Sequence, residues 1–259
     1  MQLLMVIPFR HPKLSRVRGF SLIELLVTLA VVAILSSLLF PTLGKVHGMA
    51  LILMCQNNMR VFGMALDDYR EENGRNLPPS RNQNNPQELM ALSAGTSDGV
   101  RRWDGLGLLW AKPKRYIGKD SRVFFCPSHQ AEHRFDTYAT VFTNAGLNGV
   151  SENVISGNYH YWGAWTDRVG EATKLNNANR RAIDLGKEIV LTDGMRTKRD
   201  VNHVGGCNGL FSDGHISWLG SHDLSKLLST LPSKPEPRDV QLQIFGSIVG
   251  AMGAASAAR

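Results

Sequence analysis

The stretch RGFSLIELLVTLAVVAILSSLLFP, residues 18–41, decides how the chain begins to fold. It opens a run, residues 25–44, that carries no charge. As a helix rising about 1.5 Å per residue, this run spans roughly 30 Å, the thickness of a bilayer core. Glu24 stands at the start of the run, and a carboxylate is costly in hydrocarbon. The stretch predicts a membrane-spanning helix that has a use for its glutamate.

Positive charge lies on one side of the apolar run. Arg10, Lys13, Arg16 and Arg18 precede the run, and no acid stands before Glu24. The positive-inside rule therefore predicts a single-pass protein of the cytoplasmic (inner) membrane, with a cytoplasmic N-terminus and a periplasmic head. Without these four basic residues the formal charge falls from +7 to +3. That charge is too small and too dispersed for a phosphate-binding surface, so we expect no nucleic-acid partner.

A secretory signal and a plain membrane anchor are two alternatives for this segment. A secretory signal has a shorter apolar region followed by a small-x-small cleavage site. Here the run is long and Pro-Thr-Leu-Gly follows it, residues 41–44. A plain anchor accounts for the length and the orientation, but it gives Glu24 no role.

Gly19, Phe20, Glu24, the basic leader and the apolar run together resemble the N-terminal segment of type IV prepilins and type II secretion pseudopilins. The resemblance implies that a prepilin peptidase cuts between Gly19 and Phe20 and methylates the new N-terminus, Phe20. It implies that Glu24 and Pro41 serve in assembly and that other pilin or pseudopilin subunits are partners through the helix. Glu24 can pair with the amine of Phe20 in its own chain, four residues away, or with that of a neighbouring subunit.

The helix is expected to continue beyond the membrane. Pro41 removes one helix hydrogen bond and is expected to bend the helix. Over residues 45–75, apolar residues recur every three to four positions, which is typical of an amphipathic helix with one face on the head. Asn73 and Gly74, with two prolines shortly beyond them, predict its end.

The head is predicted to consist of short strands joined by turns. The best strand candidates are residues 122–127, 158–165, 187–194 and 209–219. Within the last of these, Asp213-Gly214 predicts a hairpin with a type I′ turn. Residues 87–92 and a stretch starting at Ser221 predict short helices. Without long helical crossovers the sheet is expected to be antiparallel. The predicted fold class is α+β, with a long N-terminal helix packed on a small antiparallel sheet head, as in pilins.

The predicted organisation has five segments. They are a basic leader (1–19), a transmembrane and assembly helix (20–44), its amphipathic continuation (45–75), a periplasmic head (76–239) and an apolar C-terminal tail (240–259). Gly246 and Gly250 make one GxxxG in the tail, so a second membrane span is an alternative there. The glutamines, glycines and alanines of the tail lower its hydrophobicity and favour a packed or frayed segment.

Cys55, Cys126 and Cys207 match no zinc-finger spacing. In an oxidising compartment, three cysteines predict one disulfide and one free thiol. The spacing does not fix which two pair, and Cys55–Cys126 is the favoured candidate disulfide.

The segment HVGGCNGLFSDG places His203 ten residues before Asp213, which Gly214 follows. Together with CQNNMRVFGMALDDY and FFCPS, it resembles a group of bacterial prepilin-like proteins with an H-X9-DG segment, described as DUF1559-like. That resemblance implies a pseudopilin-like head, but no biochemical role for His203 or Asp213. We favour a structural role, in which Asp213-Gly214 forms the turn and His203 caps it or bonds Asp213. A calcium site made by Asp193, Asp213 and backbone carbonyls is the alternative, and calcium is the one cofactor considered.

Two further groups contain residues able to bind a ligand. Cys126, His129 and His133 have zinc-ligand types at tight spacing, but they lack a fourth ligand. His160 lies among aromatic residues in the stretch 159–165, which predicts core and subunit contacts, with a carbohydrate- or partner-binding surface as the alternative.

The sequence contains no P-loop, GxSxG or HExxH motif. We therefore expect no catalytic residues and no enzyme. The predicted function is that of a prepilin-like structural subunit in a type IV pilus or a type II secretion pseudopilus. One alternative is a membrane-tethered periplasmic protein that binds a ligand or polysaccharide and uses the helix only as an anchor. The other is a tethered metal-dependent hydrolase built on His203, Asp193, Asp213 and His215.

Overall fold

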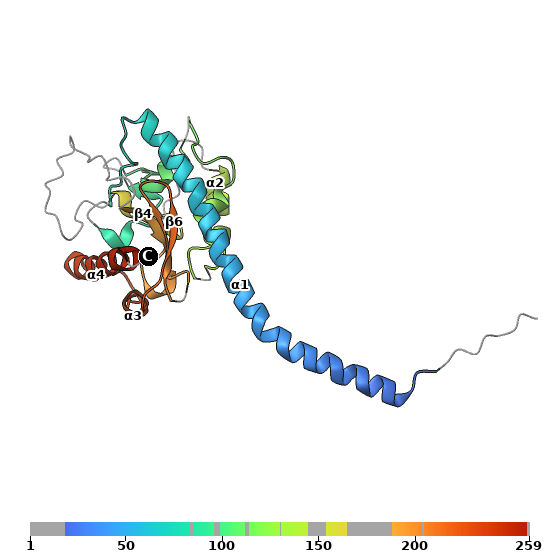
Figure 1. The fold of residues 1–259 in the computed structure, drawn as a ribbon. Helices are drawn as coiled ribbons and strands as arrows, with labels where there is room; N and C mark the ends of the chain where they lie inside the picture. Colours follow the sequence, from blue (N-terminus) through green and yellow to red (C-terminus); the bar gives the residue numbers. More distant parts are fainter. Residues whose placement is uncertain are drawn as a thin grey trace, which may run out of the picture. The chain divides into compact units, whose positions relative to one another are not determined.

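The first element, α1, is a single helix of 51 residues, Leu22–Glu72 (Figure 1). Glu24 lies in its first turn and Arg70 in its last turn, which complements the helix dipole. The helix is continuous through Pro41. It ends where Gly74 and Arg75 adopt φ values of 61° and 64°, and where the Arg75 amide donates to the Arg70 carbonyl at 2.7 Å. The predicted end of the helix at Asn73-Gly74 is confirmed.

The computed structural model describes residues 19–82, 85–95, 99–111, 114–129, 131–144, 154–164, 188–203 and 205–257. The leader up to residue 18 lies outside these residues. The chain divides into two compact units, Met1–Gly48 and Met49–Arg259. The boundary falls inside α1, so each unit contains one half of this helix. We call the second unit the head.

The head contains a four-stranded antiparallel sheet in the order β3-β4-β5-β6. Its strands are β3 (Tyr159–Tyr161), β4 (Ile189–Asp193), β5 (Cys207–Phe211) and β6 (Ile216–Leu219). A separate antiparallel pair joins β1 (Ser93–Gly95) to β2 (Arg101–Trp103). The predicted α+β class is therefore confirmed, with a long N-terminal helix and small antiparallel sheets as in pilin-like architecture.

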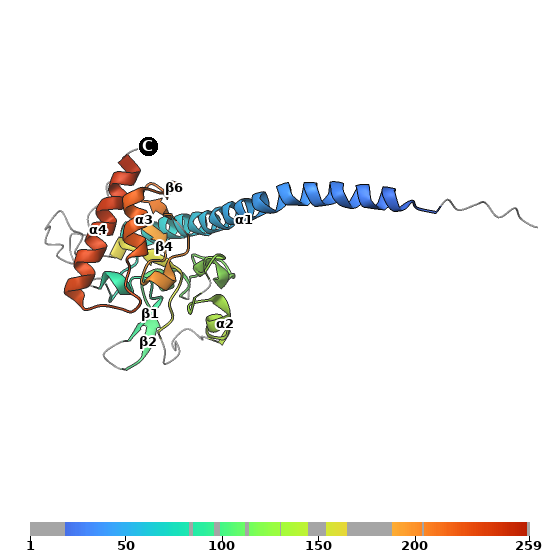
Figure 2. The ribbon, with the colours of Figure 1, turned by 90° about the horizontal axis from the view of Figure 1, so that it is seen from below.

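The four-stranded sheet is covered on both faces (Figures 1 and 2). The second half of α1 covers one face, while α3 (His222–Ser229) and α4 (Arg238–Ala257) cover the other. Neighbouring residues of β5 alternate between the two layers. Leu210 packs beside Gly63 of α1, whereas Phe211 is buried with residues of α3 and α4. A strand buried on both faces requires this alternation.

Three short elements differ from the sequence prediction. Residues 122–127 are not a strand, because the Asp120 side chain accepts a hydrogen bond from the Arg122 amide at 3.0 Å and starts a 3₁₀ helix, η3 (Ser121–Phe124). The helix expected over residues 87–92 is a 3₁₀ turn, η1 (Pro86–Glu88). The strand expected over residues 158–165 ends at Tyr161, where the 3₁₀ turn η4 (Trp162–Ala164) begins.

Other elements were not predicted at all. These are β1, β2, helix α2 (Phe135–Asn144) and the 3₁₀ helices η2 (Gly105–Leu109) and η5 (Lys198–Asp200). In contrast, the helix expected from Ser221 is confirmed as α3. Its cap is the Ser221 hydroxyl, which accepts a hydrogen bond from the Leu224 amide at 3.1 Å.

The β5–β6 hairpin lies where Asp213-Gly214 predicted it, but the type I′ turn is wrong. Gly214 has a φ of 86°, whereas Asp213 does not have a positive φ. The Gly214 amide donates to the Phe211 carbonyl, and the Phe211 amide donates to the His215 carbonyl. This is a three-residue loop that ends in a left-handed glycine. Such a loop needs a positive φ only at the glycine, so Asp213 keeps an ordinary backbone conformation.

The C-terminal segment belongs to the head. In α4, Phe245, Ile248 and Met252 are fully buried and pack in one cluster with Trp162 and Leu219. Both α4 and α1 are long and apolar enough to cross a membrane. One side of α4 packs on the sheet layer, so the apolar tail predicted at residues 240–259 is packed over its described length, as one of the two favoured forms predicted.

Candidate functional site

The predicted cleavage site lies in exposed chain directly before α1. Gly19 and Phe20 are both exposed, and Phe20 shows 77% of its surface. Ser21 begins the helix, because its carbonyl accepts from the Leu25 amide at 3.1 Å. Glu24 Oε2 accepts from the Ser21 amide at 2.9 Å, which is the carboxylate half of a capping box. Glu24 thus holds the first turn next to the Gly19–Phe20 bond.

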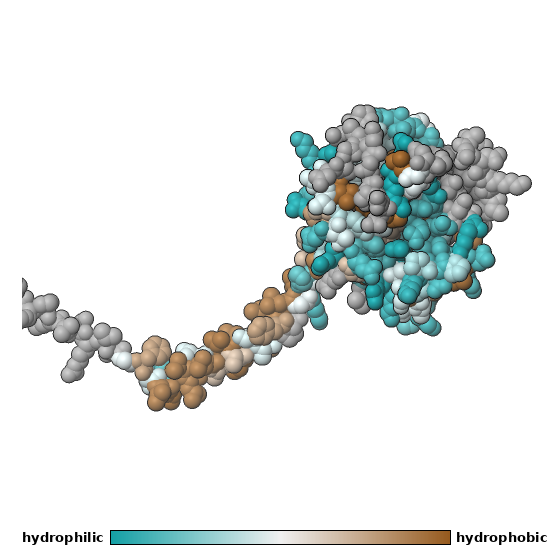
Figure 3. All heavy atoms as spheres, turned by 180° about the vertical axis from the view of Figure 1, so that it is seen from behind, coloured by the Kyte–Doolittle hydropathy of each residue, from teal (hydrophilic) through white to brown (hydrophobic). Residues whose placement is uncertain are grey.

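The first half of α1 is apolar on all sides. Leu22, Ile23, Leu25 and Leu35 are each at least half exposed, and at 100° per residue they are spread around the whole circumference of the helix. Figure 3 shows hydrophobic residues along this part of the helix. A helix that is apolar on all sides is typically surrounded by a membrane or by other helices.

In the head, a disulfide joins Cys55 of α1 to Cys126, which follows η3. This is the pair favoured from the sequence, and Cys207 is a free, buried thiol. The Asn158 side chain supports the bridge, because its Oδ1 accepts from the Cys126 amide at 3.1 Å. The Asn158 carbonyl also accepts from the Gly194 amide at 2.8 Å. The disulfide therefore ties α1 to a loop that the end of the sheet holds in place.

His203 and Asp193 lie against this disulfide, and both side chains are buried. His203 Nε2 is 3.6 Å from Cys126 Sγ and 3.6 Å from Asp193 Oδ2. The ligand atoms of Cys55, Cys126, Asp193 and His203 all lie within 4.8 Å of one another. Four segments, namely α1, the loop after η3, β4 and the chain before β5, thus bring two sulfur atoms, a carboxylate and an imidazole together.

Burial sets the protonation of this cluster. It lowers the pKa of His203 to about 4, so the imidazole is neutral at pH 7. It raises the pKa of Asp193 to about 7, although the Asn208 amide donates to Asp193 Oδ2 at 2.6 Å and favours the charged form. Asp193 Oδ1 is also buried, and it has no hydrogen-bond partner of good geometry among the described residues.

The predicted contact between His203 and Asp213 is wrong. His203 precedes β5 and lies beside the disulfide, whereas Asp213 follows β5 in the hairpin turn. There, Asp213 Oδ1 bonds His215 Nδ1 at 2.5 Å instead. Strand β5 separates the two ends of the H-X9-DG segment, so His203 and Asp213 lie at different places in the head and do not contact each other.

The same register separates Asp193 from Asp213. Thr192 pairs with Gly209 at one end of β4, and Ile189 pairs with Phe211 at the other. The two carboxylates therefore lie at opposite ends of strands roughly 13 Å long. This register is incompatible with a calcium ion shared by Asp193 and Asp213. It is equally incompatible with a hydrolase site that combines His203 and Asp193 with Asp213 and His215.

The other predicted groups serve the interior of the head. The disulfide occupies Cys126, His129 Nδ1 bonds Asn202 Oδ1 at 2.9 Å, and His133 Nδ1 bonds Tyr138 Oη at 2.7 Å. His160 and the described aromatic residues beside it, Tyr159, Tyr161 and Trp162, are buried, as the core interpretation predicted. Trp165 lies outside the described residues.

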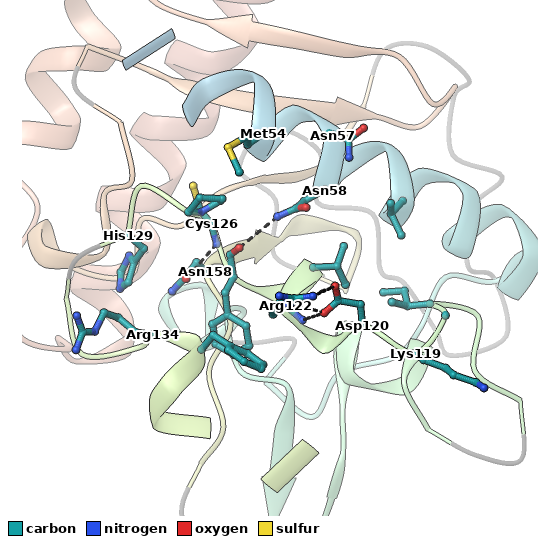
Figure 4. Close-up of a pocket in the computed structure, with 17 residues that line it drawn as sticks. Met54, Asn57, Asn58, Lys119, Asp120, Arg122, Cys126, His129, Arg134 and Asn158 are labelled. Carbon is teal, nitrogen blue, oxygen red and sulfur yellow. Dashed lines mark hydrogen bonds and ion pairs between the residues drawn. The ribbon is translucent and has the colours of Figure 1, made fainter. Parts of the chain in front are cut away.

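A pocket of about 670 Å³ lies beside the disulfide (Figure 4). Met54, Asn57 and Asn58 of α1 line it, and the chain around Cys126 and His129 lines it next to α1. At its rim Arg122 pairs with Asp120 at 2.8 Å. Cys126 is among the residues that line the pocket, and the sequence offered no signal for this pocket.

Sequence reasoning also missed Asn158 and the proximity of Asp193 to His203. Asn158 stands directly before the buried strand β3, and a polar residue at such a place is a usable signal for a buried hydrogen-bonding role. The approach of Asp193 to His203 depends on how β4 and β5 pair, and no local pattern contains that information.

Comparison with protein families finds one match. Residues 14–40 match the model described as the prokaryotic N-terminal methylation motif. Neither the curated proteins nor the solved structures give a match to this chain. The motif covers the exposed Gly19–Phe20 bond, the capping Glu24 and the apolar half of α1. It indicates a prepilin-peptidase substrate of the type IV pilin or pseudopilin kind.

Proposed function

We propose that this chain is a prepilin-like structural subunit, a pseudopilin. A prepilin peptidase cuts it between Gly19 and Phe20 and methylates Phe20, and the subunit then assembles into a type IV pilus or a type II secretion pseudopilus. The observation that carries the proposal is the methylation motif at residues 14–40, which continues into a helix that is apolar on all sides. The head supplies the outer surface of the filament, and no catalysis is required of it.

Glu24 and Pro41 are the proposed assembly residues. After cleavage, the new amine of Phe20 lies near Glu24, whose carboxylate holds the first turn of α1 in the uncut chain. In a filament, the amine of a neighbouring subunit is the proposed partner of Glu24, because pairing reduces the cost of a carboxylate among apolar helices.

The proposed location is the cytoplasmic membrane, with a single span, a cytoplasmic N-terminus and a periplasmic head. The basic leader supports this orientation. The Cys55–Cys126 disulfide supports an oxidising compartment for the head. Within prepilin-like proteins, the segment from His203 to Gly214 favours the group with the H-X9-DG segment.

Intact mass of the protein recovered from membranes tests the proposal. We expect a chain that begins at Phe20 and carries one added methyl group, and we expect Gly19→Ala to abolish both changes. Leu14→Ala, in the leader but away from the cut, is the matched control and leaves processing intact. An uncut, unmethylated chain in cells with an active prepilin peptidase would contradict the proposal.

A membrane-tethered binding protein is the second candidate, and the pocket beside Cys126 favours it. In that case the helix only displays the head, and the pocket takes a ligand or a polysaccharide segment. Filament formation separates the two functions, since a tether needs none.

A further inference from the structure

The cluster beside the pocket has the ligand set of a metal site. It contains two cysteine sulfurs, one imidazole nitrogen and one carboxylate, contributed by Cys55, Cys126, His203 and Asp193. We propose that, when its disulfide is reduced, the head binds one Zn²⁺ through these four side chains. Zinc takes four ligands of these types in a tetrahedron, and sites with four protein ligands are structural.

The distances suit a tetrahedral ion. With Zn–S about 2.3 Å and Zn–N about 2.0–2.1 Å, neighbouring ligand atoms of a tetrahedron are roughly 3.5 Å apart. His203 Nε2 is 3.6 Å from Cys126 Sγ and 3.6 Å from Asp193 Oδ2. Breaking the sulfur–sulfur bond separates the two sulfur atoms and lets each face the centre of the cluster.

The surroundings prepare the ligands. His203 Nδ1 lies 3.4 Å from Ser128 Oγ, and Ser128 Oγ donates to the Asn202 carbonyl. The Ser128 oxygen can therefore accept the Nδ1 proton, which leaves Nε2 free as a ligand. Asp193 Oδ1 is a buried oxygen without a hydrogen-bond partner of good geometry among the described residues. The side chains of Asn208 and Asn202 favour the charged form of Asp193, and a cation beside Oδ1 would give this oxygen a partner of better geometry.

The chemistry balances with an external thiol or phosphine as the reductant. Two thiol groups of the reductant give two electrons and two protons to the Cys55–Cys126 bond and become a disulfide. A phosphine gives the two electrons, and one water supplies the two protons and the oxygen of the phosphine oxide. The two protein thiols then lose their protons to solvent as the two Zn–S bonds form. An external disulfide reverses this. It takes two electrons from the two thiolates and two protons from solvent, becomes two thiols, and leaves the Cys55–Cys126 bond and a free ion. Cys126 lines the pocket, which gives reductant and ion an entry path (Figure 4).

In either redox state a link then holds α1 to the loop after η3: the disulfide in the oxidised state or the bound ion in the reduced state. The oxidised chain uses the disulfide, and a chain that has been reduced, or not yet oxidised, uses Zn²⁺. This inference does not depend on the proposed pilin function, since it concerns the head alone.

Cobalt binding by the full chain in detergent tests the site. After phosphine reduction, we expect one Co²⁺ per chain, with the visible bands of a tetrahedral ion and thiolate charge transfer, and displacement of the Co²⁺ by Zn²⁺. Cys55→Ser, His203→Ala and Asp193→Ala should each weaken binding by about tenfold or more. Cys207→Ser, which removes a buried thiol outside the cluster, is the matched control and should bind as the natural chain does. Equal cobalt affinity in Cys55→Ser, or no binding by the reduced chain, would overturn the proposal.

A second measurement needs no variant and so does not depend on how the variants fold. In the reduced natural chain, Zn²⁺ should slow alkylation of Cys55 and Cys126 by about tenfold or more, since the metal holds both as bound thiolates. Peptide mass analysis assigns the rate at each cysteine. Alkylation rates at Cys55 and Cys126 that Zn²⁺ leaves unchanged would also overturn the proposal.

Discussion

His160 is a buried imidazole with one hydrogen bond and two aromatic neighbours. Its Nε2 lies 2.5 Å from the Pro86 carbonyl, and its ring stacks on Trp162 at 4.4 Å and on Phe245 at 5.2 Å. Burial lowers the pKa of His160 to about 3, and the hydrogen bond to Pro86 offsets only part of this effect. The residue is neutral in the folded head and joins β3 to α4.

His160 should make the folded head sensitive to acid. In the unfolded chain its pKa is about 6.5. Below that pH the imidazole is protonated in the unfolded chain, whereas in the folded head it stays neutral down to about pH 3. Stability is therefore full above about pH 6.5 and falls as the pH decreases. From pH 7.5 to pH 5.5, His160 should cost about 1.4 kcal/mol.

Chemical denaturation of the detergent-solubilised chain at both pH values measures this loss. We expect His160→Gln to reduce the loss of stability between the two pH values by about that amount. His222→Gln, at an exposed position in α3, is the matched control for loss of one imidazole. An unchanged pH dependence in His160→Gln would show that the buried ring does not oppose protonation.

Single residues show what sequence patterns can and cannot predict. Asp213-Gly214 predicted a hairpin correctly, because the turn depends on local backbone conformation. The partner of His203 could not be predicted, because its neighbours Cys126 and Asp193 come from other segments of the chain. The ten-residue interval to Asp213 suggested a contact that β5 prevents.

At the scale of elements, α1 was the most predictable part. Its apolar run, its capping glutamate and its glycine-containing end all act within a few residues of one another. The aromatic stretch at residues 122–127 failed as a strand prediction, since its pattern is also that of a buried turn. Phe124 and Phe125 are buried there because they pack against Phe142 of α2, which no pattern indicated.

Glu24→Gln should separate assembly from display. The substitution keeps the size of the side chain but removes the charge that pairs with the amine of Phe20. We expect the subunit to reach the membrane, and we expect its incorporation into filaments to fall by about tenfold or more. Removing one partner of an ion pair among apolar helices leaves the other charge there without a partner, which is costly. The measurement is the ratio of sheared filament to membrane-bound subunit.

Thr28→Ala is the matched control for Glu24→Gln. It removes a polar group one turn further along α1, where Thr28 Oγ1 donates to the Leu25 carbonyl of its own helix. This variant should assemble normally. If Glu24→Gln assembles as well as Thr28→Ala does, Glu24 has no role in assembly. If the natural chain itself gives no filament fraction, the tethered binding function is the better account.

At the scale of the whole molecule, the head depends on links between segments that are far apart in sequence. The Cys55–Cys126 bridge closes a loop across 71 residues and joins the helix layer to the loop that precedes α2. Two buried clusters lie on opposite faces of the sheet, and the bridge lies on the α1 side. The cysteine count predicted the bridge, whereas the three-layer arrangement required the pairing of strands and could not be predicted.

Removing this bridge should destabilise the head substantially. For a loop of this length, a disulfide raises the free energy of unfolding by about 2–5 kcal/mol, mainly because it restricts the conformations of the unfolded chain. At about 2–4 °C per kcal/mol for a domain of this size, the double variant Cys55→Ala/Cys126→Ala should unfold about 4–20 °C lower. Thermal unfolding in detergent with a metal chelator measures this without any contribution from a bound ion. Cys207→Ala, which removes a buried thiol that contacts Met252 and leaves the bridge intact, is the control. If the double variant unfolds at the temperature of the natural chain, layer packing alone holds α1 to the head, and the bridge does not stabilise the fold.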